Sequence, residues 1–316
     1  MVVLGNRALA FDAFGTIEQL HLTVRPIPEP GPRQVRVRVI VAGLNPVDWQ
    51  IIESPALAAH FGVSAPGGFG NDFSGVIDAV GSQVTSWRVG QRVFGGARAR
   101  AAADFFLAAA DDPRLHPTPS RLSDLSAGVL DIAGRTASAV IDTLAPGEGD
   151  TVLIGAAAGG VGTIATQLAV ATGARVLGAG SPSSARAISA LGAEPVRYGS
   201  DLIADVSARA PNGITAAADL HGLDLAMDAL RLGAGPGRVV TIEADEVPPG
   251  VGMVNGADAR GSALEEIAEL IVAGRLRLPV EEVYPLEDFR AAISRQRERH
   301  THGKLALVLA PPHAAG

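Results

Sequence analysis

The sequence of 316 residues predicts an α/β protein in which a barrel-like β domain accompanies a doubly wound parallel sheet. Two observations support this fold class. Short apolar strands separated by glycine and proline dominate the first part of the chain, up to about residue 119. From Thr151 onward, apolar strands alternate with helical segments, which is the order of βαβ units. At roughly 100–200 residues per domain, the length also suits two domains.

The first part of the chain is predicted to consist of short strands. Arg7–Asp12 and Ile17–Val24 are expected to be strands on either side of a turn at Gly15. Gln34–Ala42 alternates valine with polar residues, which indicates a half-buried strand. The proline-rich segment Pro26–Pro32 lies between two of these strands and is therefore predicted to be a turn, not a polyproline ligand. Further strands are expected at Ser74–Val80 and Gln91–Phe94.

The second part is predicted to alternate strands and helices, beginning with a buried strand at Thr151–Gly155. Ser262 and Glu265 form a capping-box signature that opens a helix ending at Gly274. The tail Leu305–Leu309 is expected to be a strand. The other predicted elements are, in order, helix Gly160–Thr172, strand Arg175–Gly180, helix Ser183–Leu191, strand Ala216–Leu220, helix Leu223–Leu232 and strand Arg238–Ile242.

Composition excludes several classes of function. The net charge of −7 argues against nucleic acid as the partner. The chain has no cysteine, so disulfides, cysteine-ligated zinc and thiol nucleophiles are ruled out. No apolar run reaches the ~20 residues that span a bilayer, and the first residues lack a signal-peptide pattern. We therefore expect a soluble, cytoplasmic protein with no membrane partner. Lys304 is the only lysine, which we attribute to coding bias and not to chemistry.

A glycine-rich turn between a predicted strand and a predicted helix is the strongest local signal. It reads G-A-A-A-G-G-V-G from Gly155 to Gly162. In this context Gly159 lets the backbone approach a pyrophosphate, Gly162 allows helix and strand to pack closely, and the helix N-terminus offers unpaired N–H groups. The alternative is a turn of small residues without a ligand, but the strand–turn–helix context favours binding. The predicted cofactor residues here are Ala158, Gly159, Gly160, Val161 and Gly162.

The end of the following strand predicts which dinucleotide binds. NAD-dependent folds place Asp or Glu about 20 residues after the turn, whereas Gly178–Ser181 contains no acid. An uncharged turn with hydroxyl groups admits a 2′-phosphate, so NADPH is the predicted cofactor. Ser181 before Pro182 also has the pattern of a helix N-cap. Arg186 is either a phosphate partner or an ordinary solvent-exposed charge. The nearest candidate phosphate partners are Ser181, Ser183, Ser184, Arg186 and Tyr198.

Four stretches along the chain form a more specific set. They are A-G-L-N-P-V-D-W (Ala42–Trp49); G-N-D-F-S-G-V (Gly70–Val76) with Val80-Gly81 and V-G-Q-R-V (Val89–Val93); A-x-x-G-x-x-G (Ala156–Gly162) with Leu191–Glu194; and Tyr284–Glu287 with Gly303-Lys304. In this order the sequence resembles the zinc-independent quinone oxidoreductase branch of the medium-chain dehydrogenase/reductase family. The resemblance implies a GroES-like β-barrel catalytic domain, 1–119 with 259–316, split around a Rossmann dinucleotide-binding domain, 120–258. It also adds Thr136 to the expected cofactor residues.

The resemblance further implies a catalytic site without metal. Zinc-dependent relatives have cysteine at the position of Asn45 and a His-Glu pair at Asn71 and Asp72, so no zinc is expected. Family position places Asn45 at the nicotinamide edge, where its amide is a suitable donor to the substrate oxygen; the alternative is that it only caps the turn before Pro46. Asp48 is expected to brace this loop.

Trp49 and Arg135 depart from the family pattern. Many relatives have tyrosine at the position of Trp49, and an indole cannot deliver a proton as a phenol does, so the enolate carbon is expected to be protonated from water. Trp49 is thus either a stacking wall for the substrate or part of the core. Arg135 replaces a usual leucine and is a candidate partner for an acidic substrate or the cofactor.

Together these residues predict an NADPH-dependent reductase that transfers hydride to a quinone or to the C=C of an α,β-unsaturated carbonyl. Two alternatives stay open: an enoyl reductase that tailors a polyketide or other secondary metabolite, and a non-catalytic dinucleotide-binding protein. The expected partners are a small-molecule substrate and a second copy of the chain. A strand near Val251–Val254, at the edge of the parallel sheet, predicts a homodimer.

Overall fold

The computed structural model describes residues 5–244, 246–299 and 301–311. The chain forms two compact units. Unit 1 comprises Met1–Ile132, Ala268–Val272 and Pro279–Gly316, and unit 2 comprises Ala133–Ile267 and Ala273–Leu278. The predicted α/β class with a β-rich part and a doubly wound part is confirmed. The domain limits 1–119 with 259–316 and 120–258 follow the family pattern and stay a prediction.

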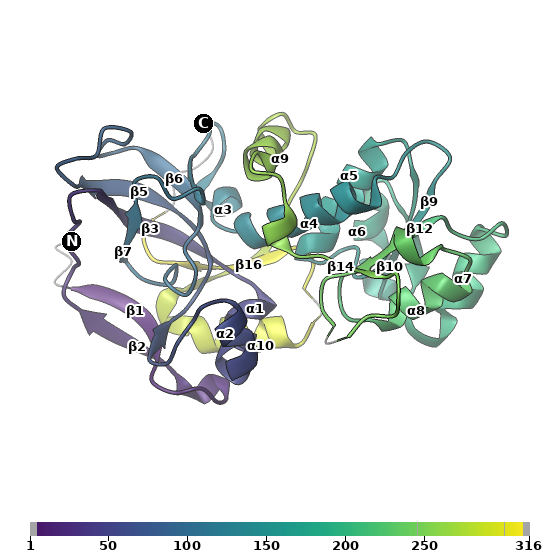
Figure 1. Ribbon diagram of the computed structural model, residues 1–316, viewed down its shortest axis with the longest axis horizontal. Helices are drawn as coiled ribbons and strands as arrows, with labels where there is room; N and C mark the ends of the chain where they lie inside the picture. Colours follow the sequence, from purple (N-terminus) through teal and green to yellow (C-terminus); the bar gives the residue numbers. More distant parts are fainter. Residues whose placement is uncertain (1–4, 245, 300, 312–316) are drawn as a thin grey trace. The chain divides into compact units, whose positions relative to one another are not determined.

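A mostly antiparallel sheet forms the centre of unit 1, with the strand order β15-β16-β3-β5-β6-β8 and β7 paired with β3 (Figure 1). In the central strand β3 (Gln34–Leu44), Val35, Val37 and Val39 are buried, as the alternation predicted. The other strands are β5 (Asp72–Val80), β6 (Arg92–Gly96), β7 (Phe105–Ala109), β8 (Leu115–Pro117), β15 (Val280–Pro285) and β16 (Lys304–Val308).

A second, three-stranded sheet in unit 1 contains β1 (Asn6–Phe11), β2 (Leu20–Arg25) and β4 (Gly67–Gly68). The predicted strand Ile17–Val24 is wrong over its first three residues, because Ile17–Gln19 is a turn of 3-10 helix. The register explains the difference. Phe11, the last residue of β1, pairs with Leu20, so the residues before Leu20 have no partner on β1.

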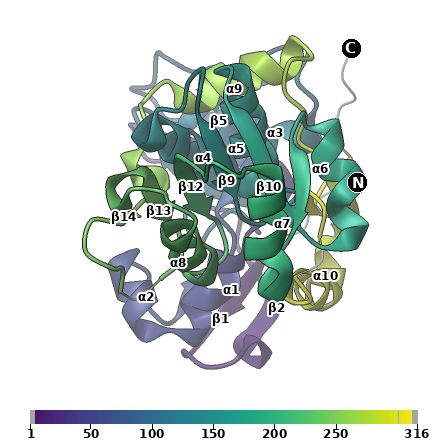
Figure 2. The same ribbon diagram turned by 90° about the vertical axis from the view of Figure 1, so that its right-hand side faces the viewer.

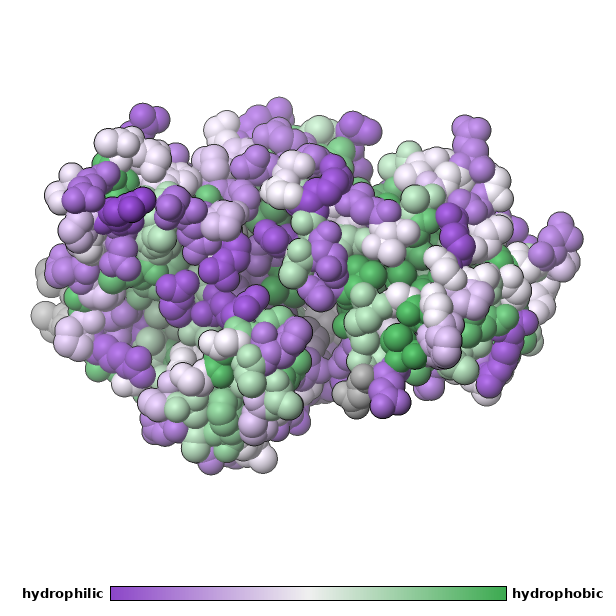
Figure 3. All heavy atoms as spheres, viewed as in Figure 1, coloured by the Kyte–Doolittle hydropathy of each residue, from purple (hydrophilic) through white to green (hydrophobic). Residues whose placement is uncertain are grey.

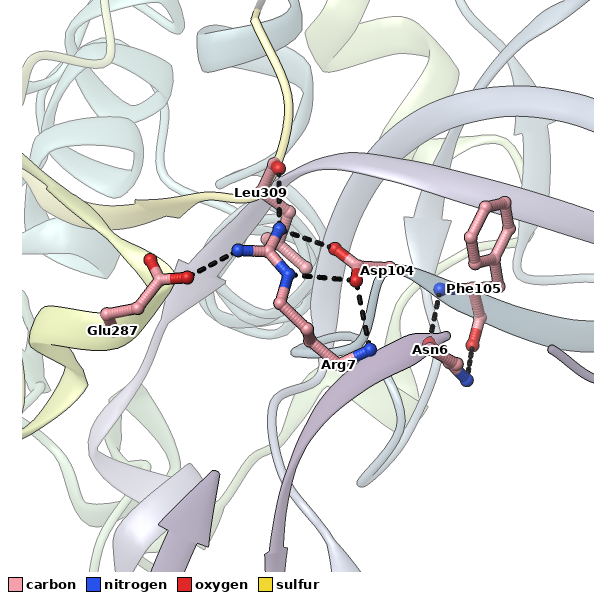
Figure 4. A network of polar contacts seen from close by, with 6 residues as sticks. All are labelled: Asn6, Arg7, Asp104, Phe105, Glu287 and Leu309. Atoms are coloured by element: carbon pink, nitrogen blue, oxygen red, sulfur yellow. Dashed lines mark hydrogen bonds and ion pairs between the residues drawn. The ribbon is translucent and has the colours of Figure 1, made fainter. Parts of the chain in front are cut away.

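Arg7 on β1 ties together distant segments of unit 1 (Figure 4). Its guanidinium donates to the Asp104 carboxylate at 2.7 and 3.0 Å, to Glu287, and to the carbonyl of Leu309 at 3.1 Å. The Asp104 side chain is 8% exposed. The hydrogen bond to Asp104 raises the pKa of Arg7 above its usual value. Four segments that are remote in the sequence therefore share one guanidinium.

Unit 2 contains a six-stranded sheet with the order β11-β10-β9-β12-β13-β14, and every neighbouring pair is parallel. Figure 2 shows β12, β9 and β10 side by side. The predicted doubly wound sheet is confirmed. The strands are β9 (Thr151–Ile154), β10 (Arg175–Gly180), β11 (Glu194–Arg197), β12 (Ala216–Asp219), β13 (Val239–Thr241) and β14 (Gly252–Met253).

The helices agree less closely with the sequence-based expectations. The helix predicted at Ser183–Leu191 begins as a 3-10 turn, Pro182–Ser184, before α6 (Ala185–Ala190). In the second part of the chain, α4 (Asp131–Leu144) and α7 (Leu202–Arg209) were not predicted. The remaining helices of this part are α5 (Gly160–Ala171), α8 (Asp224–Arg231) and α9 (Ala263–Val272). Among its described residues, unit 1 also contains four helices that were not predicted: α1 (Pro46–Glu53), α2 (Pro55–His60), α3 (Asp124–Ala127) and α10 (Phe289–Arg297).

Each unit has its own hydrophobic core. The core of unit 1 includes the aromatic side chains Phe11, Phe69, Phe73 and Phe106, and unit 2 packs smaller side chains between its sheet and helices. The face seen in Figure 3 mixes hydrophilic and hydrophobic residues. Within the described residues, no helix has the length and apolar character needed to cross a membrane. Large hydrophobic side chains that stay exposed include Leu22, Val24, Val89, Tyr198, Ile203, Met253 and Val283.

Candidate active site

The candidate active site of unit 1 lies where strands of its central sheet begin and end. β3 pairs with both β16 and β5, and the register sets the first residues of these two strands beside the last residues of β3. Asn45, which follows β3, therefore meets Lys304 at the start of β16 and Asp72 at the start of β5. All three side chains are buried.

Gly43 on β3 makes room for this arrangement. A Cβ at this position would lie 2.6 Å from the Gly128 carbonyl oxygen and 2.8 Å from the Cα of Val129. Both contacts are with backbone atoms, which cannot turn away as a flexible side chain can. Only glycine therefore lets the segment before Asn45 pass so close to residues 128–129.

A buried ion pair joins two strands within the site. The Lys304 ammonium donates to Oδ2 of Asp72 at 3.2 Å and also donates to Oδ1 of Asn45. The side chains of Lys304 and Asp72 are 4% and 0% exposed. The second Asp72 oxygen accepts the backbone N–H of Ile132 at 3.0 Å. Each charged group is thus paired, as buried charges must be.

The other end of the Asn45 amide has no such partner. Asn45 is 3% exposed, and its Nδ2 has no hydrogen-bond partner among the described residues. Leaving a buried donor unpaired costs roughly 1–3 kcal/mol. A group of this kind calls for a specific explanation, such as a ligand that supplies the missing acceptor.

Asp48 links the backbone of Asn45 to a second amide. The two residues stand in a capping-box arrangement at the start of α1, where Oδ2 of Asp48 accepts the Asn45 backbone N–H at 2.7 Å. Oδ1 accepts from Nδ2 of Asn71 at 2.5 Å. Burial raises the pKa of Asp48 to about 7, and the Asp72 charge adds to the rise. The bonds from Asn45 and Asn71 and the Lys304 charge act in the opposite direction.

Trp49 lies inside the hydrophobic core of unit 1. The residue is 7% exposed, and its indole N–H donates to Oε1 of Gln296 at 3.0 Å. The Arg297 guanidinium carbon lies 4.6 Å from the indole ring centroid. Since α10 supplies both neighbours, these contacts favour the packing role among the two roles considered for Trp49.

In the glycine-rich turn of unit 2, the start of helix α5 packs very close to the backbone of the turn. Gly159 is the N-cap of α5, which begins at Gly160. A Cβ on Gly162 would lie 2.1 Å from the Ala156 carbonyl oxygen, so only glycine fits there. Ala158 is buried, and its carbonyl accepts the Thr163 hydroxyl at 3.2 Å. The turn thus leads directly into a helix of twelve residues, and the first N–H groups of a helix have no partner within the helix itself, which suits them to an anion.

The predicted phosphate partners follow β10. Ser181 is the N-cap of the 3-10 turn, and its Oγ lies 2.8 Å from Oγ of Ser183 and 2.7 Å from Oγ of Ser184. Ser184 is buried, whereas Arg186 is exposed and Tyr198 is 57% exposed. Three hydroxyl groups therefore gather at the carboxyl end of β10.

Two further residues of α4 lie beside a loop of unit 2. The Arg135 Nε donates to the Gly256 carbonyl at 3.2 Å. Thr136 is buried, and its Oγ1 would lie 3.3 Å from a Cβ placed on Gly256. The Arg135 guanidinium thus already donates one hydrogen bond to the backbone, and its role toward a substrate or cofactor stays a prediction.

Sequence reasoning missed Lys304 as a member of the site. The signals available were its position in the Gly303-Lys304 pair and its being the only lysine, and neither indicates a contact with Asn45. Asp72 was noted only as the position of a zinc-site glutamate in relatives. Among the residues that the structure describes, no group of three His, Asp or Glu side chains is arranged to hold a metal ion.

Comparisons with known proteins define the class. Residues 31–109 match the alcohol dehydrogenase GroES-like domain, and residues 191–307 match a family described as zinc-binding dehydrogenase. The pig quinone oxidoreductase is 30% identical over 309 residues, which cover 90% of this chain and 91% of the relative. The chain therefore belongs to the quinone oxidoreductase family of medium-chain dehydrogenases/reductases, as the motifs predicted. Proteins of this family are oxidoreductases that bind a nicotinamide dinucleotide.

Three other relatives show the range of similarity. The quinone oxidoreductase of Pseudomonas aeruginosa is 33% identical over 205 residues, which span 63% of this chain and 60% of that protein. The spectinabilin polyketide synthase system protein NorB of Streptomyces orinoci is 29% identical over 94% of this chain but only 14% of its own length. The solved quinone oxidoreductase from Coxiella burnetii has a TM-score of 0.84, 26% identity and coverage of 96% and 99%.

Proposed function

We propose that the protein uses NADPH to deliver hydride to a quinone or to the C=C of an α,β-unsaturated carbonyl, without zinc. The observation that carries the proposal is the buried Nδ2 of Asn45, a donor without a partner among the described residues. In such a reaction negative charge grows on the substrate oxygen. A fixed N–H donor that needs no reorganisation stabilises that charge.

The residues of unit 2 fit a nicotinamide dinucleotide. The first N–H groups of α5 and the close turn at Gly162 suit a pyrophosphate. When bound, the cofactor would supply the hydride. The hydroxyl groups of Ser181 and Ser184 and the exposed Arg186 suit a 2′-phosphate, and no acid follows β10 to repel it. These features support NADPH over NADH.

In this proposal Asn45 donates to the substrate oxygen and Asp48 holds the loop that carries Asn45. The Asp48 carboxylate accepts from the backbone of Asn45 and from Asn71, so it fixes the start of α1. Trp49 supports the segment that carries Asn45, because its indole N–H donates a hydrogen bond to Gln296. Protonation of the product carbon is assigned to water.

Zinc does not fit this donor set. The positions of Asn45 and Asn71 carry amides, and the chain has no cysteine to provide a thiolate. The one amide oxygen that Asn45 offers is taken by the Lys304 ammonium, which would repel a divalent cation at the same place. The proposed reaction avoids the need for a Lewis acid, because its substrates are electrophilic at carbon.

Enoyl reduction in a polyketide or similar pathway is a second candidate, supported by the similarity to the Streptomyces orinoci polyketide synthase protein along 94% of this chain. The two candidates share the hydride step and the Asn45 donor. They differ in the substrate, which is a free quinone or enone in one case and an enoyl thioester in the other.

The deciding experiment measures NADPH consumption by the purified protein with quinones, free enones and an enoyl thioester, each with and without chelator. Turnover of quinones or free enones in both conditions is expected. Turnover of the thioester alone would favour the second candidate. No turnover with any substrate, despite NADPH binding, would identify a non-catalytic dinucleotide-binding protein. Activity lost to chelator would refute zinc independence.

A further inference from the structure

The contact between Lys304 and Asn45 determines which end of the Asn45 amide is free. An ammonium group has three N–H donors and no acceptor. The Asn45 atom that it touches is therefore the carbonyl oxygen, Oδ1. The amide nitrogen, Nδ2, must then face away from Lys304, and it is the atom left without a partner.

This orientation is a real choice, because an amide presents nearly the same shape when it is turned over. With Lys304 absent, the Asp72 carboxylate that now pairs with the ammonium would offer an acceptor to Nδ2. The Asn45 amide would then rotate so that its NH₂ group points toward Asp72. Its oxygen would point toward the position that the proposal gives to the substrate oxygen. An oxygen there repels a substrate oxygen on which negative charge is growing.

We infer that Lys304 is a positioning residue that holds Oδ1 of Asn45 and so presents Nδ2 to the substrate oxygen. The ammonium also polarises the amide, which strengthens Nδ2–H as a donor. The Asp72 carboxylate keeps the ammonium in place from a neighbouring strand. The inference rests on the proposed donor role of Asn45.

The test is a double-mutant cycle with steady-state kinetics, NADPH binding and thermal melts on the same preparations. Lys304→Met removes the donor and keeps an unbranched side chain, whereas Lys304→Arg keeps a cationic donor. If loss of the charged hydrogen bond from Lys304 lets the Asn45 amide reverse its orientation, kcat should fall by about 10–100-fold. Lys304→Met is expected to show this loss with the NADPH Kd unchanged, and Lys304→Arg is expected to recover part of it.

Coupling between the two residues separates positioning from general stability. In the Asn45→Ala background, Lys304→Met should cost little further kcat, because the amide that Lys304 orients is already gone. An equal loss in both backgrounds, or wild-type kcat in Lys304→Met, would overturn the inference. Wild-type kcat in Lys304→Met would mean that the capping-box arrangement with Asp48 orients the Asn45 amide without help from Lys304.

A measurement on the unmodified protein keeps the inference testable should Lys304→Met not fold. A neutron structure of the deuterated protein should show both amide deuterons of Asn45 on the atom facing away from Lys304. Deuterons on the atom that contacts Nζ would refute it. The proposed function fails separately: if Asn45→Ala retains full kcat, Asn45 is no donor, whatever its orientation.

Discussion

Lys304 and Asn45 are 259 positions apart in the sequence, yet the Lys304 ammonium donates a hydrogen bond to the Asn45 side chain. The antiparallel pairing of β16 with β3 makes this contact, because it sets the start of one strand beside the end of the other. A residue near the end of the chain therefore fixes an amide near its beginning.

We expect Asn45→Ala to lower kcat by about 10²–10³ while NADPH binding changes little, because the variant loses one donor to the developing oxyanion. Asn45→Asp should be at least as harmful, since it puts negative charge beside that oxygen. Asn212→Ala, at an exposed loop position of unit 2, is the control. A lower melting temperature with near-normal kcat in Asn45→Ala would instead assign Asn45 to shaping the turn.

Asp48 should make stability depend on pH near neutrality. Burial raises its pKa from 3.8 to about 7 in the folded protein. Between these two pH values Asp48 is therefore protonated in the folded state and ionised in the unfolded chain. The stabilisation is therefore fully present below pH 3.8 and is lost as pH rises through about 7, with a size on the order of a few kcal/mol.

Urea unfolding between pH 4 and pH 8 tests this expectation. The wild-type protein should lose stability with rising pH relative to Asp48→Asn, whose amide does not ionise. Asp111→Asn, at a side chain that is 80% exposed, should keep the wild-type slope. Parallel pH profiles for wild type and Asp48→Asn would show that Asp48 is ionised throughout.

Ser181→Asp should reverse the cofactor preference. The new carboxylate would repel a 2′-phosphate and accept a bond from a ribose 2′-hydroxyl. Dissociation constants for NADPH and NADH in both proteins measure the effect. Thr172→Asp adds the same charge just before β10, at the amino end of the strand, and should leave the preference unaltered. Tighter binding of NADH by the wild-type protein would refute the expected preference for NADPH.

Arg7→Met should destabilise unit 1 by about 1–3 kcal/mol, because it leaves the buried Asp104 carboxylate without its cationic partner. The partial exposure of Arg7, 31% of its side chain, keeps this figure below that for a fully buried pair. Arg33→Met removes an exposed ion pair at 3.8 Å and should change stability by less than about 0.5 kcal/mol. Equal melting temperatures for the two variants would contradict this account.

We also expect a homodimer formed through β14. This strand ends the parallel sheet, where it pairs with β13 alone among the described residues, and Met253 on it is 42% exposed. An edge of unpaired backbone groups can be continued across a two-fold axis by a second copy. Light scattering at micromolar concentration should give twice the chain mass. A monomer mass would rule this out.

Local patterns in the sequence predicted much of the fold. The valine alternation of β3 and the strand–turn–helix around Gly159 depend on neighbours along the chain, and both are present. The elements that were missed include the short strand β11, helices α1, α2, α3 and α10 of unit 1, and helices α4 and α7 of unit 2. Glu194–Arg197 has only four residues and includes Pro195, and it becomes a strand because β10 offers it an edge. Pairing of this kind carries no local signal.

By itself, the sequence determined the α/β class and the glycine turn, because spacing, glycine and proline act over a few residues. The resemblance to a known family made Asn45 and Asp48 candidates. Tertiary structure decided what those candidates touch. The strand pairing put the only lysine against Asn45, moved the Trp49 indole onto Gln296, and buried Asp48 deeply enough to raise its pKa. Hydrogen-bond direction and desolvation depend on groups that arrive from distant strands, so the chain order could not reveal them.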